Sequence, residues 1–348
     1  MITAKGYAAQ SKDANLTPFS FERRALEKKD VLIEISHCGV CHSDVHQARN
    51  EWGFSLYPMV PGHEIVGKIT AIGAEVTKFK VGDFVGVGCF VDSCRNCPEC
   101  SKGIEQYCDG RVGTYSSKDK NNLTTQGGYS NCIVVDEQYT VKIPKALDHN
   151  LAGVAPLLCA GITTYSPLRY VNIKPGDKVA VAGLGGLGHM AVKFAVAFGA
   201  EVTVLSRSEN KKEDAKKLGA HHFALINTQE ELKKVNNSFD IIVNTIGSKH
   251  NYQLYLDMLK TNGKMIVLGL PEEPQTLHPF SIVPKRKSII GSMIGGIAET
   301  QEMLNYCAEK NIFADVEVIP IQQINEAFER MLKSDVKYRF VIGMDSLN

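Results

Sequence analysis

The clearest indication of the fold lies in Val179-Ala180-Val181-Ala182-Gly183-Leu184-Gly185-Gly186-Leu187-Gly188. Its apolar start is typical of a buried strand, and the residues from His189 to Phe198 have the pattern of a helix. The glycines permit a tight turn, close approach of the backbone to a pyrophosphate, and tight packing of helix on strand. The first N–H groups of the helix add partial positive charge for an anion. We therefore predict a dinucleotide-binding turn; a plain structural turn is the alternative.

Strand and helix patterns alternate through the rest of this region. Short apolar runs are separated by longer stretches of helical periodicity. We predict strands at 179–182, 201–206, 222–226, 239–244, 264–269 and 288–293, and helices at 209–218 and 251–260. Six such strands favour a doubly wound parallel six-stranded sheet.

The end of the second of these strands carries no acidic residue. Proteins that bind NAD usually place Asp or Glu there, about 20 residues after the turn, to accept the ribose hydroxyls. Here the strand ends in Ser206-Arg207-Ser208, and Lys211 and Lys212 follow. Arg can bind a phosphate with two parallel hydrogen bonds and Lys adds a point charge. We therefore predict a preference for NADP(H); a solvated basic helix start is the alternative.

The first 150 residues consist of short β-type runs broken by glycine, which favours a sandwich or a partly open barrel. We predict strands at 31–35, 64–72, 84–90, 129–135 and 139–143. Residues 151–168 have a helical pattern that includes Cys159. The tail reads as helices near 299–310 and 323–333 with strands at 315–319 and 337–342.

A compact cysteine cluster lies within the β-rich region. Cys94, Cys97, Cys100 and Cys108 fit within fifteen residues, and four thiolates at this spacing suit a closed tetrahedral zinc site. Disulfides, an iron–sulfur cluster and a nucleic-acid-binding zinc ribbon are the alternatives. The mixed local charge weakens the last of these. We expect a structural zinc that stabilises a loop with little core of its own.

Composition bounds the remaining choices. The chain has 348 residues and a formal net charge of +1, which predicts about two domains and gives no electrostatic case for nucleic acid or membrane. We find no signal-peptide pattern at the start and no run of roughly 20 apolar residues. Ten cysteines in that context favour thiols and metal over disulfides. We expect a cytoplasmic protein, with Cys38, Cys132 and Cys307 packed in the core.

Three further segments contain metal-binding residue types. They are Gly39-Val40-Cys41-His42-Ser43-Asp44-Val45-His46, Val60-Pro61-Gly62-His63-Glu64 and Pro156-Leu157-Leu158-Cys159-Ala160-Gly161. If Cys41, His63 and Cys159 converge, they form a two-cysteine, one-histidine site with one open position, as in catalytic zinc centres. Taken singly, each would more often be a packed core residue.

These segments, together with Cys159-Ala160-Gly161-Ile162-Thr163-Thr164-Tyr165-Ser166-Pro167-Leu168, resemble the zinc-dependent medium-chain alcohol dehydrogenases, and the cinnamyl alcohol dehydrogenase group in particular. The resemblance covers essentially the whole chain. It implies a GroES-like catalytic domain at 1–152 with 296–348, a Rossmann domain at 153–295, and a homodimer. It also implies a long loop at 110–126 near the active site or an interface.

The implied activity is reversible oxidation of primary alcohols to aldehydes, of cinnamyl type and broad range, with NADP(H) and two zinc ions per chain. The substrate oxygen would take the open zinc position. Ser43 would be the first proton acceptor and His46 the relay to solvent, although His46 could be exposed and idle. Glu64 could ligate zinc, orient a ligand or form a salt bridge. Family positions for the nicotinamide end are Thr163, Thr245, Gly269, Ser292, Met293 and Ile294.

For the substrate pocket we expect Trp52, Phe54, Cys89, Met293 and Ile294. Trp52 and Phe54 could instead be core residues. Plant cinnamyl enzymes carry a bulky aromatic side chain where this chain has Gly113, which implies a wider pocket and broader aldehyde tolerance. Two alternatives to this function are a zinc polyol dehydrogenase, whose pocket should be more polar, and a member of the fold that has lost catalysis.

Overall fold

A computed structural model describes residues 1–271 and 273–347. The chain separates into two compact units. Unit 1 contains Met1–Ile162 and the chain from Gly295 onward, and unit 2 is Thr163–Ile294. The sequence placed the first boundary at 152 and the second at 295. Residues 153–162 fall in unit 1 because the segment before Cys159 packs on the strands of that unit.

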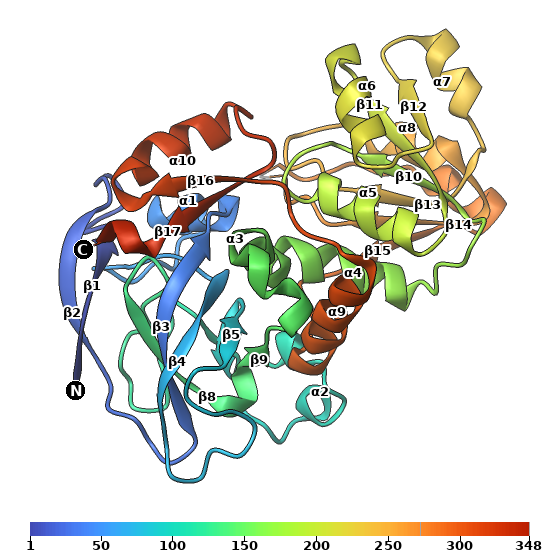
Figure 1. The fold of residues 1–348 in the computed structure, drawn as a ribbon. Helices are drawn as coiled ribbons and strands as arrows, with labels where there is room; N and C mark the ends of the chain where they lie inside the picture. Colours follow the sequence, from blue (N-terminus) through green and yellow to red (C-terminus); the bar gives the residue numbers. More distant parts are fainter. Residues whose placement is uncertain (272, 348) are drawn as a thin grey trace. The chain divides into compact units, whose positions relative to one another are not determined.

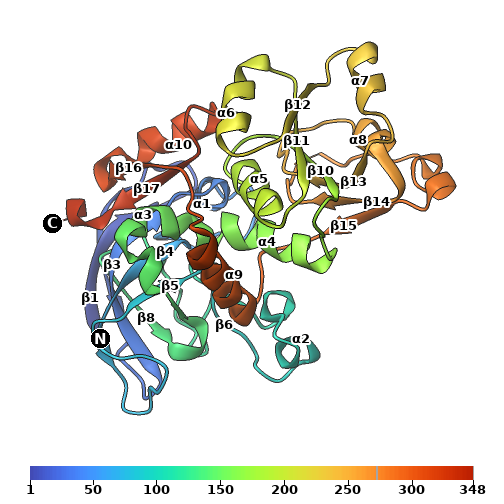
Figure 2. The same ribbon diagram turned by 45° about the vertical axis from the view of Figure 1, so that its right-hand side comes forward.

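Unit 2 is built on a parallel sheet with the strand order β12-β11-β10-β13-β14-β15, whose strands lie side by side in Figure 2. This confirms the doubly wound six-stranded sheet. The central strands are runs of buried Val, Ile and Ala, as expected for a sheet covered on both faces. The strands are β10 (Lys178–Ala182), β11 (Glu201–Ser206), β12 (His222–Leu225), β13 (Phe239–Asn244), β14 (Leu259–Val267) and β15 (Ser288–Gly291).

Helices join these strands. They are α5 (Gly188–Ala197), α6 (Lys212–Lys217), α7 (Gln229–Val235) and α8 (Tyr252–Met258), with single 3-10 turns at Glu209–Lys211, Pro279–Ser281 and Val283–Lys285. Helix α7 was not predicted from the sequence, because it is short and highly charged. Its start signal was present: Thr228 and Glu231 form a capping box, with the Thr228 side chain accepting from the Glu231 N–H.

Unit 1 is built on a mainly antiparallel sheet, which confirms the β-rich, GroES-like expectation (Figure 1). Its order is β16-β17-β3-β4-β5-β9, and β8 also pairs with β3. Strand β17 from the tail pairs with β3, Val341 opposite Gly39, so the tail returns to this unit. The strands are β3 (Asp30–Gly39), β4 (Ile65–Ile72), β5 (Phe84–Val87), β8 (Cys132–Asp136), β9 (Val141–Lys142), β16 (Val316–Pro320) and β17 (Arg339–Gly343).

Two smaller sheets complete this unit. Strands β1 (Ile2–Ala8) and β2 (Thr17–Arg23) pair with each other, as do β6 (Phe90–Asp92) and β7 (Val112–Gly113). Strand β1 was not predicted because its inward positions hold small residues, which give little hydrophobic periodicity. A Cβ added to its Gly6 would lie 2.4 Å from the Tyr129 carbonyl oxygen, so the small residue is required there.

The helices of unit 1 are short, apart from two in the tail. They are α1 (His42–Ala48), α2 (Pro98–Ser101), α3 (Leu151–Val154), α9 (Ile297–Lys310) and α10 (Ile324–Leu332), with 3-10 turns at Glu105–Tyr107, Glu137–Tyr139, Lys145–Asn150, Ala155–Leu158, Ile321–Gln323 and Met344–Leu347. Helix α4 (Ala160–Tyr170) spans the boundary between the units.

The expectation of one continuous helix around Cys159 was wrong. Cys159 has φ −130° and ψ −71°, which breaks the helix between Leu158 and Ala160 and turns this residue out of the helical repeat. In the described part of the chain, no single helix is long and apolar enough to cross a membrane. The segments Lys145–Leu158 and α4 pass that criterion only as a pair, and they are bent by 66°.

Candidate active site

Four side chains from three separate segments meet in unit 1. Cys41 precedes α1, His63 and Glu64 precede β4, and Cys159 lies in the helix break. Their ligand atoms all lie within 4.8 Å of one another, and all four residues are buried. The Nε2 atom of His63 is 3.3 Å from the Cys159 sulfur. The structure therefore brings together the residues that the sequence singled out as metal ligands.

This donor set fits a zinc ion. At normal zinc–sulfur and zinc–nitrogen bond lengths, a tetrahedral site places its sulfur and nitrogen donors about 3.6 Å apart, close to the His63–Cys159 separation of 3.3 Å. His63 directs Nε2 toward the cluster because its Nδ1 is 3.0 Å from an Asp44 carboxylate oxygen. A carboxylate behind a metal-binding histidine is the usual arrangement in such sites.

Asp44 organises the ligand segments. Its fully buried carboxylate accepts hydrogen bonds from the Cys41 N–H at 2.9 Å, the Gly62 N–H at 3.1 Å and the Tyr129 hydroxyl at 3.0 Å, in addition to His63. No role was predicted for Asp44 from the sequence. Its position three residues after the N-cap Cys41, where a capping-box acid stands, was the available signal.

A buried ion pair lies behind the cluster. Arg339 of β17 pairs with Glu64, and both side chains are almost fully buried. Burial raises the pKa of Glu64 to about 7, against the opposing effect of Arg339. The pKa of Cys41 is lowered by a hydrogen bond from Cys159 and by the positive charge of Arg339, which favours a thiolate. Arg339 was not foreseen as a site residue, because it lies 275 positions from Glu64.

Gly39 is required by the same arrangement. A Cβ at Gly39 would lie 1.9 Å from Oε2 of Glu64, so no larger residue fits unless the carboxylate moves. That oxygen is buried and has no hydrogen-bond partner. Glu64 therefore offers one free carboxylate oxygen next to the ligand cluster, while its other oxygen bonds to Arg339.

Ser43 and His46 lie on helix α1. The Ser43 hydroxyl is 3.7 Å from the Cys41 sulfur. His46 is half-buried and pairs through Nδ1 with Glu51, so it is not an isolated exposed side chain. Its ring stacks on Trp52, with centroids 5.5 Å apart.

The aromatic residues expected in the pocket are not core residues. Trp52 is 42% exposed and Phe54 is 62% exposed, and their rings stack at 6.0 Å. Cys89 is half-buried and has its sulfur 3.9 Å from the carbonyl oxygen of Leu158, the residue before Cys159. Cys89 therefore lies close to the ligand cluster, and Trp52 and Phe54 form an aromatic stack with His46.

The loop at 110–126 also reaches the cluster. The Tyr115 ring lies 5.8 Å from the His63 ring. At Gly113, an added Cβ would lie 2.8 Å from the Ser117 hydroxyl, so a bulky residue here would require Ser117 to move. The remaining unassigned cysteines, Cys38, Cys132 and Cys307, are buried, as the sequence predicted.

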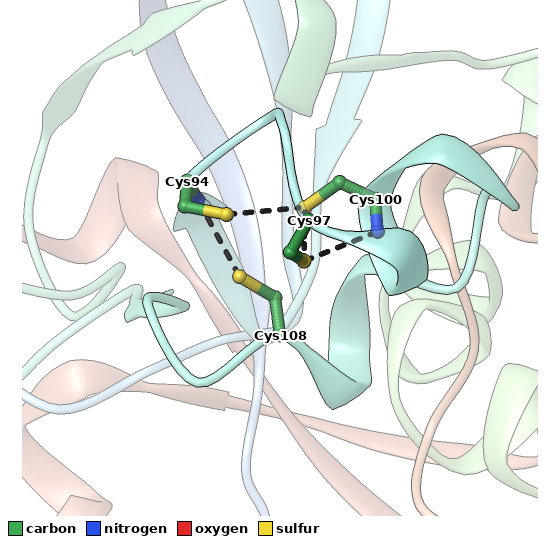
Figure 3. A group of neighbouring side chains, drawn as sticks. All are labelled: Cys94, Cys97, Cys100 and Cys108. Carbon is green, nitrogen blue, oxygen red and sulfur yellow. Dashed lines mark hydrogen bonds between the residues drawn. The ribbon is translucent and has the colours of Figure 1, made fainter.

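The four-cysteine lobe forms a second cluster, shown in Figure 3. Its sulfur atoms lie within 4.8 Å of one another. Cys100 is 3.5 Å from Cys97 and 4.0 Å from Cys94, sulfur to sulfur, where a tetrahedral zinc–thiolate site requires about 3.8 Å. The Cys94 N–H points to the Cys108 sulfur at 3.5 Å. These residues fit a closed zinc site held by α2 and its flanking turns.

The glycine turn of unit 2 connects β10 to α5. Gly183 has φ +91°, a left-handed conformation that favours glycine. A Cβ at Gly188 would lie 2.0 Å from the Gly183 carbonyl oxygen, whereas a Cβ at Gly185 would meet no atom within 4 Å. Gly188 therefore packs helix against strand, and Gly185 leaves open space beside the turn. Leu184, Gly186 and Leu187 complete the turn.

The end of β11 presents hydroxyl and basic groups. The Ser206 hydroxyl accepts from the Ser208 N–H at 3.0 Å, which curls the chain, and the Arg207 side chain is exposed. Lys211 and Lys212 follow in the next helical turn. These residues lie at the carboxyl end of the strand beside β10, where doubly wound sheets bind ligands.

The other residues expected to contact cofactor are spread over unit 2. Thr245 donates to the carbonyl oxygens of Ala182 at 2.9 Å and Gly183 at 3.1 Å, so it braces the glycine turn. Ile294 has φ +41°, a strained conformation for a β-branched residue. Thr163 is buried, Gly269 lies against the Ile246 backbone, Ser292 is half-buried and Met293 is exposed.

Known proteins resemble this chain over its whole length. Residues 27–145 match the alcohol dehydrogenase GroES-like domain and residues 186–309 match the zinc-binding dehydrogenase domain. NADP-dependent alcohol dehydrogenase C 1 of Mycolicibacterium smegmatis is 53% identical, covering 100% of this chain and 99% of its own. Mannitol dehydrogenase of Apium graveolens is 51% identical over 99% of this chain and 94% of its own.

A solved structure gives the same result. The cinnamyl alcohol dehydrogenase (CAD) of Helicobacter pylori, crystallised with NADP(H), is 45% identical, covers 99% of each chain and superposes with a TM-score of 0.92. Both domain matches, the identity and the three converging segments that carry Cys41, His63 and Cys159 lead to one assignment: this chain belongs to the zinc-binding alcohol dehydrogenase family of oxidoreductases.

Proposed function

We propose that this enzyme interconverts primary alcohols and aldehydes of aromatic, cinnamyl type and broad range by hydride transfer with NADP(H). The observation that carries the proposal is the buried cluster of Cys41, His63, Glu64 and Cys159, whose ligand atoms lie within 4.8 Å. A zinc ion held by the two thiolates and the imidazole would act as a Lewis acid toward the substrate oxygen. Glu64 has a free oxygen and would serve as an additional, exchangeable ligand.

Residues of this chain balance the negative charge of the thiolates and transfer the proton of the alcohol. Asp44 fixes the ring of His63, and Arg339 offsets part of the negative charge that the thiolates bring into the buried site. Ser43 lies beside the Cys41 sulfur and would accept the proton of the alcohol. His46, one turn along α1 and half-exposed, would pass it to solvent, with Glu51 orienting the imidazole.

We assign NADP(H) to unit 2. The turn at Gly183 to Gly188 would hold the pyrophosphate at the start of α5. Ser206, Arg207 and Ser208, with Lys211 and Lys212, would bind the 2′-phosphate. Thr163, Thr245, Gly269 and the backbone of Ser292, Met293 and Ile294 would contact the nicotinamide end. The cofactor in the names of the mycobacterial relative and the H. pylori structure supports this choice.

The substrate pocket we propose includes Trp52, Phe54, Cys89, Met293 and Ile294. The exposed stack of Trp52 on Phe54 supports a planar, apolar substrate. Gly113 supports tolerance of larger aldehydes.

The second candidate function is polyol oxidation, which the 51% identity to a mannitol dehydrogenase favours. A chain without catalysis is disfavoured because the donors of the ligand cluster are present and converge.

We also propose a homodimer in the cytoplasm. Strand β15 is an edge of the described sheet of unit 2. Leu270, Phe280 and Val283, in the chain between β14 and β15, are strongly exposed. An unpaired strand edge and exposed apolar side chains are both typical of an interface. Two sites made of thiolates suit a reducing compartment.

Steady-state kinetics with two cofactors and two substrates tests the proposed activity. We expect kcat/KM for NADPH to exceed that for NADH by about 10- to 100-fold, because one charge-assisted phosphate contact provides that discrimination. Cinnamaldehyde should be reduced far more efficiently than fructose. A higher kcat/KM for fructose than for cinnamaldehyde would favour the polyol alternative. Equal kcat/KM values for NADPH and NADH would refute the proposal that the end of β11 binds the 2′-phosphate.

A test substitution and a matched control accompany that experiment. Arg207→Ala should lower the NADPH value and leave the NADH value nearly unchanged, because only NADPH carries the 2′-phosphate. Lys216→Ala, which removes an exposed cation further along α6, should change neither.

Elemental analysis tests the two metal sites. We expect two zinc ions in each wild-type chain and one in each single-site variant. Cys41→Ser should abolish turnover with little loss of thermal stability. Cys100→Ser should lower the unfolding temperature, because a structural zinc contributes folding free energy directly. Iron, or a single metal ion per wild-type chain, would overturn the proposal.

His46→Gln tests the proton relay. We expect alcohol oxidation to slow by about 100-fold, the lower end of what positioned proton transfer contributes, with an altered pH profile and unchanged zinc content. His42→Gln on the same helix, with its ring 6.4 Å from His46, is the matched control and should behave as wild type. An unchanged pH profile in His46→Gln would remove His46 from the mechanism.

Light scattering tests the dimer. The wild-type enzyme should have twice the mass of one chain. Replacing Val283 by Asp should shift it toward the monomer, because the substitution places a charge in the proposed interface. Tyr170→Asp, at a comparably exposed position of unit 2, should leave the mass unchanged. A monomeric wild type would disprove the assembly.

A further inference from the structure

Ser116 is in an unusual place for a serine. It lies in the loop at 110–126, is buried, and has φ +53°. Only a few per cent of non-glycine residues adopt this left-handed conformation, and it is energetically unfavourable for them. The side chain must therefore make contacts that compensate for the backbone conformation.

The Ser116 hydroxyl accepts two hydrogen bonds from a different segment. The Leu56 N–H donates to it at 2.8 Å and the Gln47 side-chain amide at 3.3 Å. Gln47 is buried at the end of α1 and also donates to the Ser55 hydroxyl at 3.0 Å. The loop at 110–126 is thus bonded both to α1 and to the chain that follows it.

These bonds close the segment that carries the two exposed aromatic residues. The Ser55 N–H donates to the Asn50 side chain at 2.9 Å, which folds residues 50–55 into a short loop. Trp52 and Phe54 lie within it. Ser116 bonds to Leu56, just after the end of this loop. This bond restrains the loop from which Trp52 stacks on His46 and Phe54.

The neighbouring residue of Ser116 contacts the metal-ligand cluster. The Tyr115 ring packs on His63 at 5.8 Å between centroids. Two consecutive residues of one loop therefore touch the ligand histidine on one side and the aromatic segment on the other. The relative position of those two features depends on this loop.

We propose that Ser116 is a specificity-determining positioning residue that fixes the Trp52–Phe54 segment relative to the metal-ligand cluster. Ser116 itself touches no reacting atom. It holds the aromatic stack so that a planar ring can lie against it while the substrate oxygen is at the metal. The inference rests on the proposed function in one respect, the aromatic substrate.

Ser116→Gly is the direct test, because glycine adopts the left-handed backbone without strain and the substitution removes the CH2OH side chain that accepts the two hydrogen bonds. Asn122→Gly is the matched control: Asn122 is in the same loop, has φ +61° and is exposed. Both substitutions place a glycine at a left-handed position of the same loop, but only the first breaks the bonds to Leu56 and Gln47. Gln47→Met removes one donor from the other side and serves as a second test.

The first readout is independent of catalysis. Trp52 is the single tryptophan of the chain, so acrylamide quenching of the intrinsic tryptophan fluorescence reports on this segment alone. We expect quenching to increase at least twofold in Ser116→Gly and less in Gln47→Met, and to stay at the wild-type value in Asn122→Gly. Zinc content should be the same in all variants.

The second readout is a KM-against-kcat comparison. For cinnamaldehyde, KM should rise about tenfold in Ser116→Gly, as expected from the loss of two hydrogen bonds, with kcat changed little. For acetaldehyde, which has no ring, KM should not change. The inference would be overturned if Ser116→Gly matched Asn122→Gly both in quenching and in the ratio of KM for cinnamaldehyde to KM for acetaldehyde. Failure of the wild type to reduce any aromatic aldehyde would instead refute the proposed substrate class, and the quenching result would still decide whether Ser116 fixes the segment.

Discussion

The site in unit 1 depends on the buried carboxylate of Asp44. A charge with no exposure to water is costly unless hydrogen bonds satisfy it. Asp44 meets this requirement with donors from Cys41, Gly62, His63 and Tyr129. The same bonds fix the start of α1 and the turn before β4, so two ligand segments are placed by one side chain. Removing this carboxylate would leave the ligand backbone N–H groups and the His63 ring without their common acceptor.

A second buried charge, the guanidinium of Arg339, offsets negative charge at the site. Arg339 comes from the C-terminal strand β17 and pairs with Glu64 beside the thiols of Cys41 and Cys159. The pairing of β17 with β3 in the main sheet therefore also brings this positive charge to the site. Through this strand, the tail of the chain, which follows unit 2 in the sequence, contributes a charged side chain to unit 1.

The sequence was sufficient where a local pattern determines the structure. The boundaries of β11 and β13 were predicted to the residue, because both are apolar runs bounded by clear turns. The cysteine lobe followed from its spacing alone. The ligand cluster, in contrast, required the family resemblance, since nothing local says that Cys41, His63 and Cys159 will meet.

Other features had no local signal or a misleading one. The break at Cys159 was read as continuous helix because Leu157, Leu158 and Ala160 favour a helix, although Pro156 and Gly161 on either side do not. Arg339 reads as an ordinary strand residue. Ser116 is one serine in a polar loop, and its positive φ and two bonds depend on Leu56 and Gln47, some sixty positions away. Such contacts are tertiary and cannot be read from periodicity.

The proposed activity requires that a hydride pass directly between the cofactor and the carbon that bears the substrate oxygen. The most direct test is reduction of cinnamaldehyde with NADPH that carries deuterium at both C4 positions, followed by mass spectrometry and NMR of the alcohol. We expect one deuterium on the carbinol carbon and none released to water. A carbinol hydrogen taken from solvent, with no deuterium in the product, would contradict it.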